Sequence, residues 1–213
     1  MSEYKESLDI FNGSRPDELH TIIAWNGKKN EVATKDYIKK ELKDNFEIVF
    51  QKLIELDAIT EKKLAQSIYS TNKSRVVDSH IYLIVVKDKN PIYEWKRATS
   101  CDQVLNVNLK HIKEDMRIKI GGRRKAYRTI HTSYNLEETL LVLKPLNLDH
   151  LVKRPTFKNF TELFQMLNDD ANLKYLVQRS FHELDNSPSF FKVKDVDVLV
   201  NDYYYFKAIT GAR

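Results

Sequence analysis

The stretch around which this sequence is organised is Arg-Thr-Ile-His-Thr-Ser-Tyr-Asn-Leu-Glu-Glu, residues 128–138. Its first half has the pattern of a short strand that ends at His131. Its second half starts a helix, because Asn135 is a favourable N-cap and Glu138 stands three residues later, at the spacing of a capping box. Leucines at helical spacing follow, and the helix is expected to end before Pro145.

His131 is therefore predicted at a strand-to-helix junction. Backbone N–H groups and the positive end of a helix dipole favour an anion at such a junction. This position makes His131 a candidate catalytic residue for phosphate chemistry. The alternative is a surface histidine without a function.

A basic segment leads into this junction. Between residues 96 and 128 the positively charged side chains are Lys96, Arg97, Lys110, Lys113, Arg117, Lys119, Arg123, Arg124, Lys125 and Arg128, against Asp102, Glu114 and Asp115. The whole chain has a formal charge of +5 and a pI near 9.0. We expect Arg117, Arg123, Arg124, Lys125 and Arg128 to bind phosphate. The alternative is an ordinary solvated face.

The hydrophobic pattern alternates between strand and helix. Expected strands lie at residues 20–25, 46–56, 81–86 and up to His131, and expected helices at 34–45, from Thr60 onward, and in the second half of 104–118. Gly121-Gly122 is expected to break the last of these helices. The order predicts an α/β (α+β) fold with helices covering a sheet, and a ferredoxin-like split βαβ sheet is the simplest such fold.

Residues 19–147 resemble a nucleoside diphosphate kinase. The features that carry the resemblance are the first strand followed by Asn26-Gly27, the strand-helix-strand middle, and an Ile-His-x-Ser segment that leads into a helix bearing glutamate. The resemblance implies that His131 is the phosphate acceptor, with Ser133 as a phosphate contact. The family carries a lysine and an aspartate around a proline in its first turn, where this chain has Ala24-Trp25-Asn26. The resemblance therefore implies a degenerate member that binds a phosphorylated ligand, or one whose domain only packs, rather than an active kinase.

The C-terminal part of the sequence has a different pattern, which indicates a separate domain. Residues 148–159 are expected to form a linker, and residues 160–213 the start of another domain. On a strand through Asp195-Val196-Asp197-Val198-Leu199-Val200, the two aspartates would project from one face. Two adjacent carboxylates favour a cation such as Mg²⁺. This resembles the Asp-x-Asp strand of nucleotidyltransferases, which implies metal binding by Asp195 and Asp197; the alternative is an edge strand with solvated acids.

The composition limits the class of protein. With 213 residues and 42% hydrophobic content, the chain can bury one complete core and part of another. Its single cysteine, Cys101, excludes an internal disulfide and a cysteine-rich zinc site and suits a reducing compartment. No apolar run approaches membrane-spanning length, residues 1–18 look like a polar arm, and a cytoplasmic protein is expected.

Two functions are consistent with these patterns. The first is the N-terminal part of a phosphoryl- or nucleotidyl-transfer protein that binds a nucleotide or sugar phosphate with Mg²⁺, in a setting such as glycan assembly. The second is a non-catalytic ferredoxin-like module that docks an acidic partner or nucleic acid through its basic segment. Magnesium-dependent nucleotide binding would favour the first, and salt-dependent oligonucleotide binding the second.

Overall fold

The computed structural model describes residues 16–42, 46–69, 79–97, 102–125, 129–153, 156–170, 173–177 and 197–210. The chain divides into two compact units after Val152. Within the described residues the secondary structure is a mixture of helices and mainly antiparallel strands, which confirms the predicted α+β class. None of the described helices is long and apolar enough to cross a membrane.

The described part of the first unit is built on a four-stranded sheet. Its strands are β1 (Glu18–Trp25), β2 (Phe46–Glu55), β3 (His80–Asp88) and β6 (Ile130–Thr132), in the order β2-β3-β1-β6. Every neighbouring pair is antiparallel. The central strands β1 and β3 are almost entirely buried, as their continuous apolar sequences predict.

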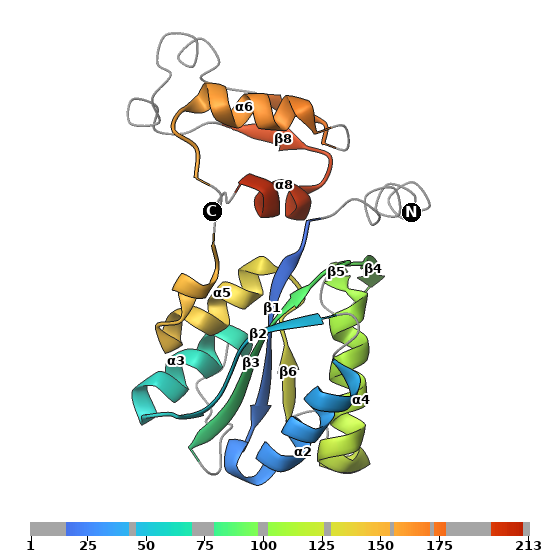
Figure 1. Cartoon of the computed structure of the whole chain (residues 1–213), viewed down its shortest axis with the longest axis vertical. Helices are drawn as coiled ribbons and strands as arrows, with labels where there is room; N and C mark the ends of the chain where they lie inside the picture. The colour runs from blue at the N-terminus through green and yellow to red at the C-terminus, as the bar shows by residue number, and fades with distance from the viewer. Residues whose placement is uncertain are drawn as a thin grey trace. The chain divides into compact units, whose positions relative to one another are not determined.

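Helices cover both faces of this sheet (Figure 1). On one face lie α2 (Gly27–Glu41) and α4 (Val107–Lys125), and on the other lie α3 (Ala58–Tyr69) and α5 (Leu136–Leu143). Alternate strand residues feed two separate cores, because successive side chains of a strand point to opposite faces. The core beneath α2 and α4 contains the strand residues Ile22, Ala24, Tyr82 and Ile84, packed with Tyr37, Leu109 and Met116. The core beneath α3 and α5 contains Ile23, Trp25, Leu83 and Val85, packed with Leu64 and Val142.

The turn from β1 into α2 requires its glycine. A Cβ on Gly27 would lie 2.6 Å from the carbonyl carbon of Ile81 and 2.9 Å from the backbone nitrogen of Tyr82. The preceding Asn26 has a left-handed backbone (φ 56°), and the Asn30 side chain donates a hydrogen bond to the Trp25 carbonyl at 2.7 Å. Helix α2 therefore starts at Gly27, seven residues before the predicted start at Thr34.

The structure differs from the sequence analysis at three other places. The segment after β3 forms a hairpin of β4 (Tyr93–Arg97) and β5 (Asp102–Asn106), which was not expected. Helix α4 continues through Gly121-Gly122 to Lys125. Helix α3 starts at Ala58, two residues before the predicted Thr60, and Asp57 caps it: Asp57 Oδ1 accepts hydrogen bonds from the backbone N–H groups of Ile59 and Thr60. These bonds, with Thr60 contributing most, lower the pKa of Asp57.

Residues 148–152, expected to be part of a linker, belong to the first unit. They include a short 3₁₀ helix, η3 (Asp149–Leu151), which follows another, η2 (Lys144–Leu146). Leu148, Leu151 and Val152 pack against the core beneath α3 and α5.

The second unit contains α6 (Phe160–Asp169), β7 (Tyr175–Val177), β8 (Val198–Val200) and α8 (Tyr203–Thr210). Strands β7 and β8 are antiparallel. Asn159 caps α6, because its side-chain oxygen accepts the N–H of Glu162 at 2.9 Å. A small core forms around Leu167 and Leu173, against which Phe164, Tyr175 and Phe206 pack.

Candidate functional site

The junction around His131 follows the sequence prediction closely. Strand β6 ends at Thr132, α5 begins at Leu136, and the side-chain oxygen of Asn135 accepts the N–H of Glu138 at 2.9 Å. The Glu138 carboxylate reaches back to the N–H of Tyr134 at 2.8 Å, one residue before the N-cap. Burial raises the pKa of Glu138, although the bond from Tyr134 partly opposes this shift. The partial positive charge at the N-terminus of α5 is thus partly neutralised by the carboxylate of Glu138.

The imidazole of His131 rests on an aromatic platform. In the β1–β6 pairing His131 lies opposite Ile23, so its side chain is on the face covered by α3 and α5. Its ring meets the ring of Tyr69 in a T-shaped contact, with 5.6 Å between centroids. The Tyr69 hydroxyl accepts a hydrogen bond of 3.0 Å from the indole nitrogen of the fully buried Trp25. This chain of contacts orients one face of the imidazole, and His131 as a whole residue is partly exposed.

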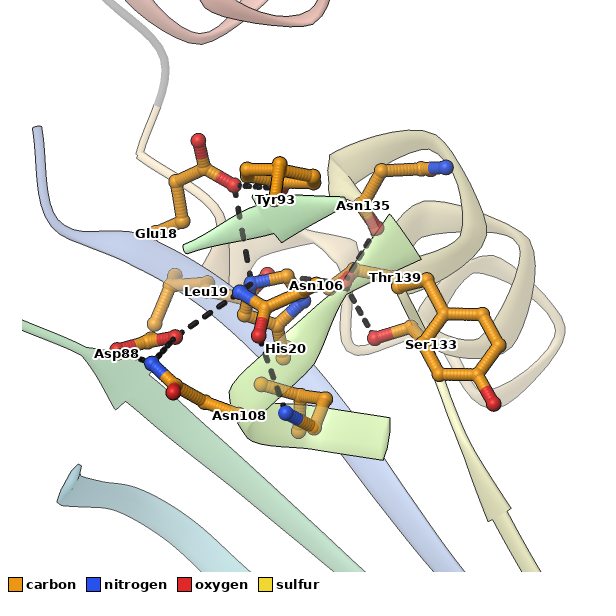
Figure 2. A network of polar contacts seen from close by, with 12 residues as sticks. Glu18, Leu19, His20, Asp88, Tyr93, Asn106, Asn108, Ser133, Asn135 and Thr139 are labelled. Carbon is orange, nitrogen blue, oxygen red and sulfur yellow. Dashed lines mark hydrogen bonds and ion pairs between the residues drawn. The ribbon is translucent and has the colours of Figure 1, made fainter. Parts of the chain in front are cut away.

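Ser133 is in the interior, which does not suit the predicted phosphate contact. The side chain is fully buried, and Oγ accepts the N–H of Thr21 at 2.8 Å. Oγ also lies 2.8 Å from Oγ1 of Thr139, which donates to the carbonyl of Leu19 at 2.9 Å (Figure 2). These bonds tie the end of β6 and the first turn of α5 to β1, so the observed role of Ser133 is structural.

Arg117, another predicted phosphate contact, binds the protein backbone. Its Nε and Nη2 atoms donate to the carbonyl of Ile130 at 3.3 and 3.1 Å. Arg117 therefore lies beside the His131 strand, on a helix that covers the face opposite the imidazole. Arg128 and the side chains of Arg123, Arg124 and Lys125 lie outside the described part of the chain.

Other cations of the basic segment are paired with acids, two of which lie outside the segment. Lys110 forms a salt bridge with Glu94, and Lys119 forms salt bridges with Glu41 at 2.8 Å and Asp115 at 3.0 Å. Counting charges along the segment alone missed Glu41 and Glu94. The positive field of α4 is consequently weaker than the sequence suggests.

A second polar cluster, which we call the buried network, was missed by the sequence reasoning. It joins Glu18 and His20 of β1 with Asp88 of β3, Tyr93 of β4 and Asn106 of β5 (Figure 2). Glu18 and Asp88 are direct partners across the two strands, and the Tyr93 hydroxyl donates to Glu18. The available signal was that Glu18 and His20 are two residues apart, and hence on one face, in a strand that is otherwise apolar except for Thr21.

Asn106 is the centre of this network. Its amide nitrogen lies 2.9 Å from Asp88 Oδ2 and 3.3 Å from His20 Nε2, so each of its two protons has an acceptor. Its carbonyl oxygen accepts the N–H of Leu109 at 3.0 Å and caps α4. Asn108 adds a further amide donor to Asp88 at 3.1 Å. The network therefore connects the sheet, the hairpin and the start of α4.

Burial decides the chemistry of the buried network. Glu18 is 5% exposed, and His20, Asp88 and Asn106 are fully buried. Burial lowers the pKa of His20 to about 3, with a smaller opposing effect from the Ser133 backbone. Since a ligand has no access to these groups, the network has a structural role and His131 remains the candidate reactive histidine.

The predicted metal site is only partly within the described residues. Asp197 is exposed and directly precedes β8, which starts at Val198, so the expected strand does not extend back to this aspartate. Asp195 lies outside the described residues. In the part of the chain that the structure describes, no three His, Cys, Asp or Glu side chains are grouped to hold a metal ion.

Comparison with known protein families and with curated proteins finds no match to this chain. Assignment of a function therefore depends on the geometry of the residues above.

Proposed function

We propose that the first unit is a ferredoxin-like domain, similar to nucleoside diphosphate kinases, that binds a nucleotide or sugar phosphate within a phosphoryl- or nucleotidyl-transfer protein. The strand order β2-β3-β1-β6 supports this fold, because β1 and β2 are parallel to each other and separated by the antiparallel β3. Helix α2 connects β1 to β2, and α4 precedes β6 in the chain.

The observation that carries the proposal is the oriented imidazole of His131, a residue that is partly exposed. A histidine ring can donate a hydrogen bond to a phosphate oxygen or attack phosphorus through a nitrogen. Tyr69 and Trp25 hold this ring from one side. Where the resembling family has a lysine, this chain has the buried Ala24, which favours ligand binding over full kinase activity.

The alternative of docking a polyanion receives less support. The salt bridges of Lys110 and Lys119 use positive charges that such a partner would need. Lys113 is likewise engaged, through a 3.0 Å hydrogen bond to the Tyr134 hydroxyl.

The proposal predicts that His131→Asn weakens ATP binding by about tenfold, the effect of losing one hydrogen bond to a charged group. Isothermal titration of the whole chain with ATP measures the change. His111→Asn, which alters an exposed histidine of α4, is the matched control and should bind like the wild type. Equal affinities of the two variants, or no ATP binding by the wild type, would contradict the proposal.

For the second unit we infer that Asp195 and Asp197 hold Mg²⁺, which would neutralise phosphate charge near the acids. The exposed position of Asp197 is compatible with such a site. Asp197→Asn should weaken Mg²⁺ binding by about tenfold, because one anionic ligand becomes neutral. Titration with MgCl₂ tests this, with the exposed Asp169→Asn of α6 as control. If both variants bind Mg²⁺ as the wild type does, the metal site is elsewhere or absent.

A further inference from the structure

A groove lies between α2 and the edge strand β2. It has a volume of about 330 Å³ and is lined by Lys35, Ile38, Lys39, Ile48, Gln51 and Tyr82. Strand β2 is irregular here, with a bulge between Ile48 and Phe50. Ile38 and Tyr82 belong to the core beneath α2 and α4, whereas His131 lies on the opposite face of the sheet. The groove is therefore separate from the proposed phosphate site.

The lining combines an apolar floor with a cationic rim. Ile38, Ile48 and the ring of Tyr82 supply the floor. The Lys35 ammonium lies 5.8 Å from the centroid of the Tyr82 ring and bonds to Glu31, which raises the pKa of Lys35. Among the described residues that line the groove there is no acid. An anion is thus the complementary ligand.

Two polar groups of the groove are available to a ligand. Among the residues that the structure describes, the Lys39 ammonium and the Gln51 carboxamide have no hydrogen-bond or ion-pair partner. Lys35 and Lys39 are four residues apart on α2, so both side chains emerge on one side of the helix. A single anionic group can therefore contact Lys39 while the rest of the ligand covers the apolar floor.

We propose that this groove binds a compact organic anion consisting of one apolar ring with a phosphate or carboxylate. The volume is at the small end of ligand pockets, about 300–1,000 Å³, and fits one ring rather than a whole nucleotide. The ring packs on Ile48 and Tyr82, the anion binds Lys39, and Gln51 donates a further hydrogen bond. The site does not depend on the function proposed for His131.

Titration of the whole ¹⁵N-labelled chain with phenyl phosphate, followed by NMR, tests this site. The expected result is saturable shifts at Lys39 and Gln51, and binding at least about tenfold tighter than that of inorganic phosphate, because the ring buries apolar area. Lys39→Glu should weaken phenyl phosphate binding by about tenfold or more. Lys40→Glu makes the same charge change at an exposed neighbour outside the groove and should have little effect.

Three results would overturn the proposal. They are equal affinity for phenyl phosphate and inorganic phosphate, equal losses in Lys39→Glu and Lys40→Glu, and shifts centred on His131 instead of Gln51. Lys39 is exposed, so both variants should unfold like the wild type. ATP binding should be unchanged in Lys39→Glu, which separates this site from the one proposed at His131.

Discussion

Replacing Asp88 with alanine should lower the free energy of unfolding by about 1–3 kcal/mol, the cost of leaving a buried hydrogen-bond donor without its acceptor. Asp88 is fully buried and accepts hydrogen bonds from the side-chain amides of Asn106 and Asn108 and from the N–H of Asn90. Its removal leaves the fully buried Asn106 amide without this acceptor, whereas Asn108 keeps the Asn90 carbonyl at 2.9 Å and Asn90 itself is exposed. The loss also loosens Asn106, which caps α4.

Urea unfolding at pH 7 measures this effect. Asp88→Asn should also be destabilising although it keeps the shape, because one acceptor oxygen becomes a donor that faces Asn106 and Asn108. Asp36→Ala, an exposed change on α2, should alter stability by no more than about 0.5 kcal/mol. If Asp88→Ala were as mild as Asp36→Ala, the buried network would contribute little to stability.

The sheet was predictable because its strands carry simple local signals. β3 is a continuous apolar run, β1 ends at the turn signal Asn26-Gly27, and the β6–α5 junction has a cap at Asn135 with Glu138 at the correct spacing. In each case the deciding interaction lies within a few residues. Local patterns therefore indicated the main strands and the helix after His131.

The elements that were missed depend on contacts distant in the sequence. The β4–β5 hairpin is polar, and Tyr93 is fixed by Glu18, 75 residues earlier. Helix α4 tolerates Gly121-Gly122 although each glycine costs about 1 kcal/mol, because Leu109, Ile112 and Met116 anchor the helix in the core. No window of the sequence shows such compensation.

The candidate site was predictable only where local sequence patterns determine it. The position of His131 follows from the strand-to-helix pattern, but its support by Tyr69 requires knowing that α3 crosses the face next to β6. Likewise, Ser133 is polar and close to His131, yet its hydroxyl points to Thr21 on the neighbouring strand. Whether a polar side chain faces a ligand or the interior depends on strand pairing, which one sequence does not provide.

His20 should make the protein sensitive to acid. In the unfolded chain its imidazole has a pKa near the ordinary value of 6.5, and burial lowers the pKa in the folded chain to about 3. Between these values the unfolded state binds one proton more than the folded state. The free energy of unfolding therefore falls as the pH falls through this window, by up to about 1.4 kcal/mol per pH unit and on the order of 5 kcal/mol in total.

The contacts around His20 give a second reason why its pKa is lowered in the folded chain. Asn106 donates to Nε2, so a proton on Nε2 would break that bond, although the Glu18 carboxylate 3.7 Å away would attract the charge. Urea unfolding between pH 7 and pH 4 should show a shallower acid loss for His20→Gln than for the wild type, whereas His111→Gln, at an exposed site, should keep the wild-type slope. NMR titration of the folded wild type should show no protonation of His20 above about pH 4. An imidazole that titrates near pH 6 in the folded chain would mean that Glu18, rather than burial, controls its charge.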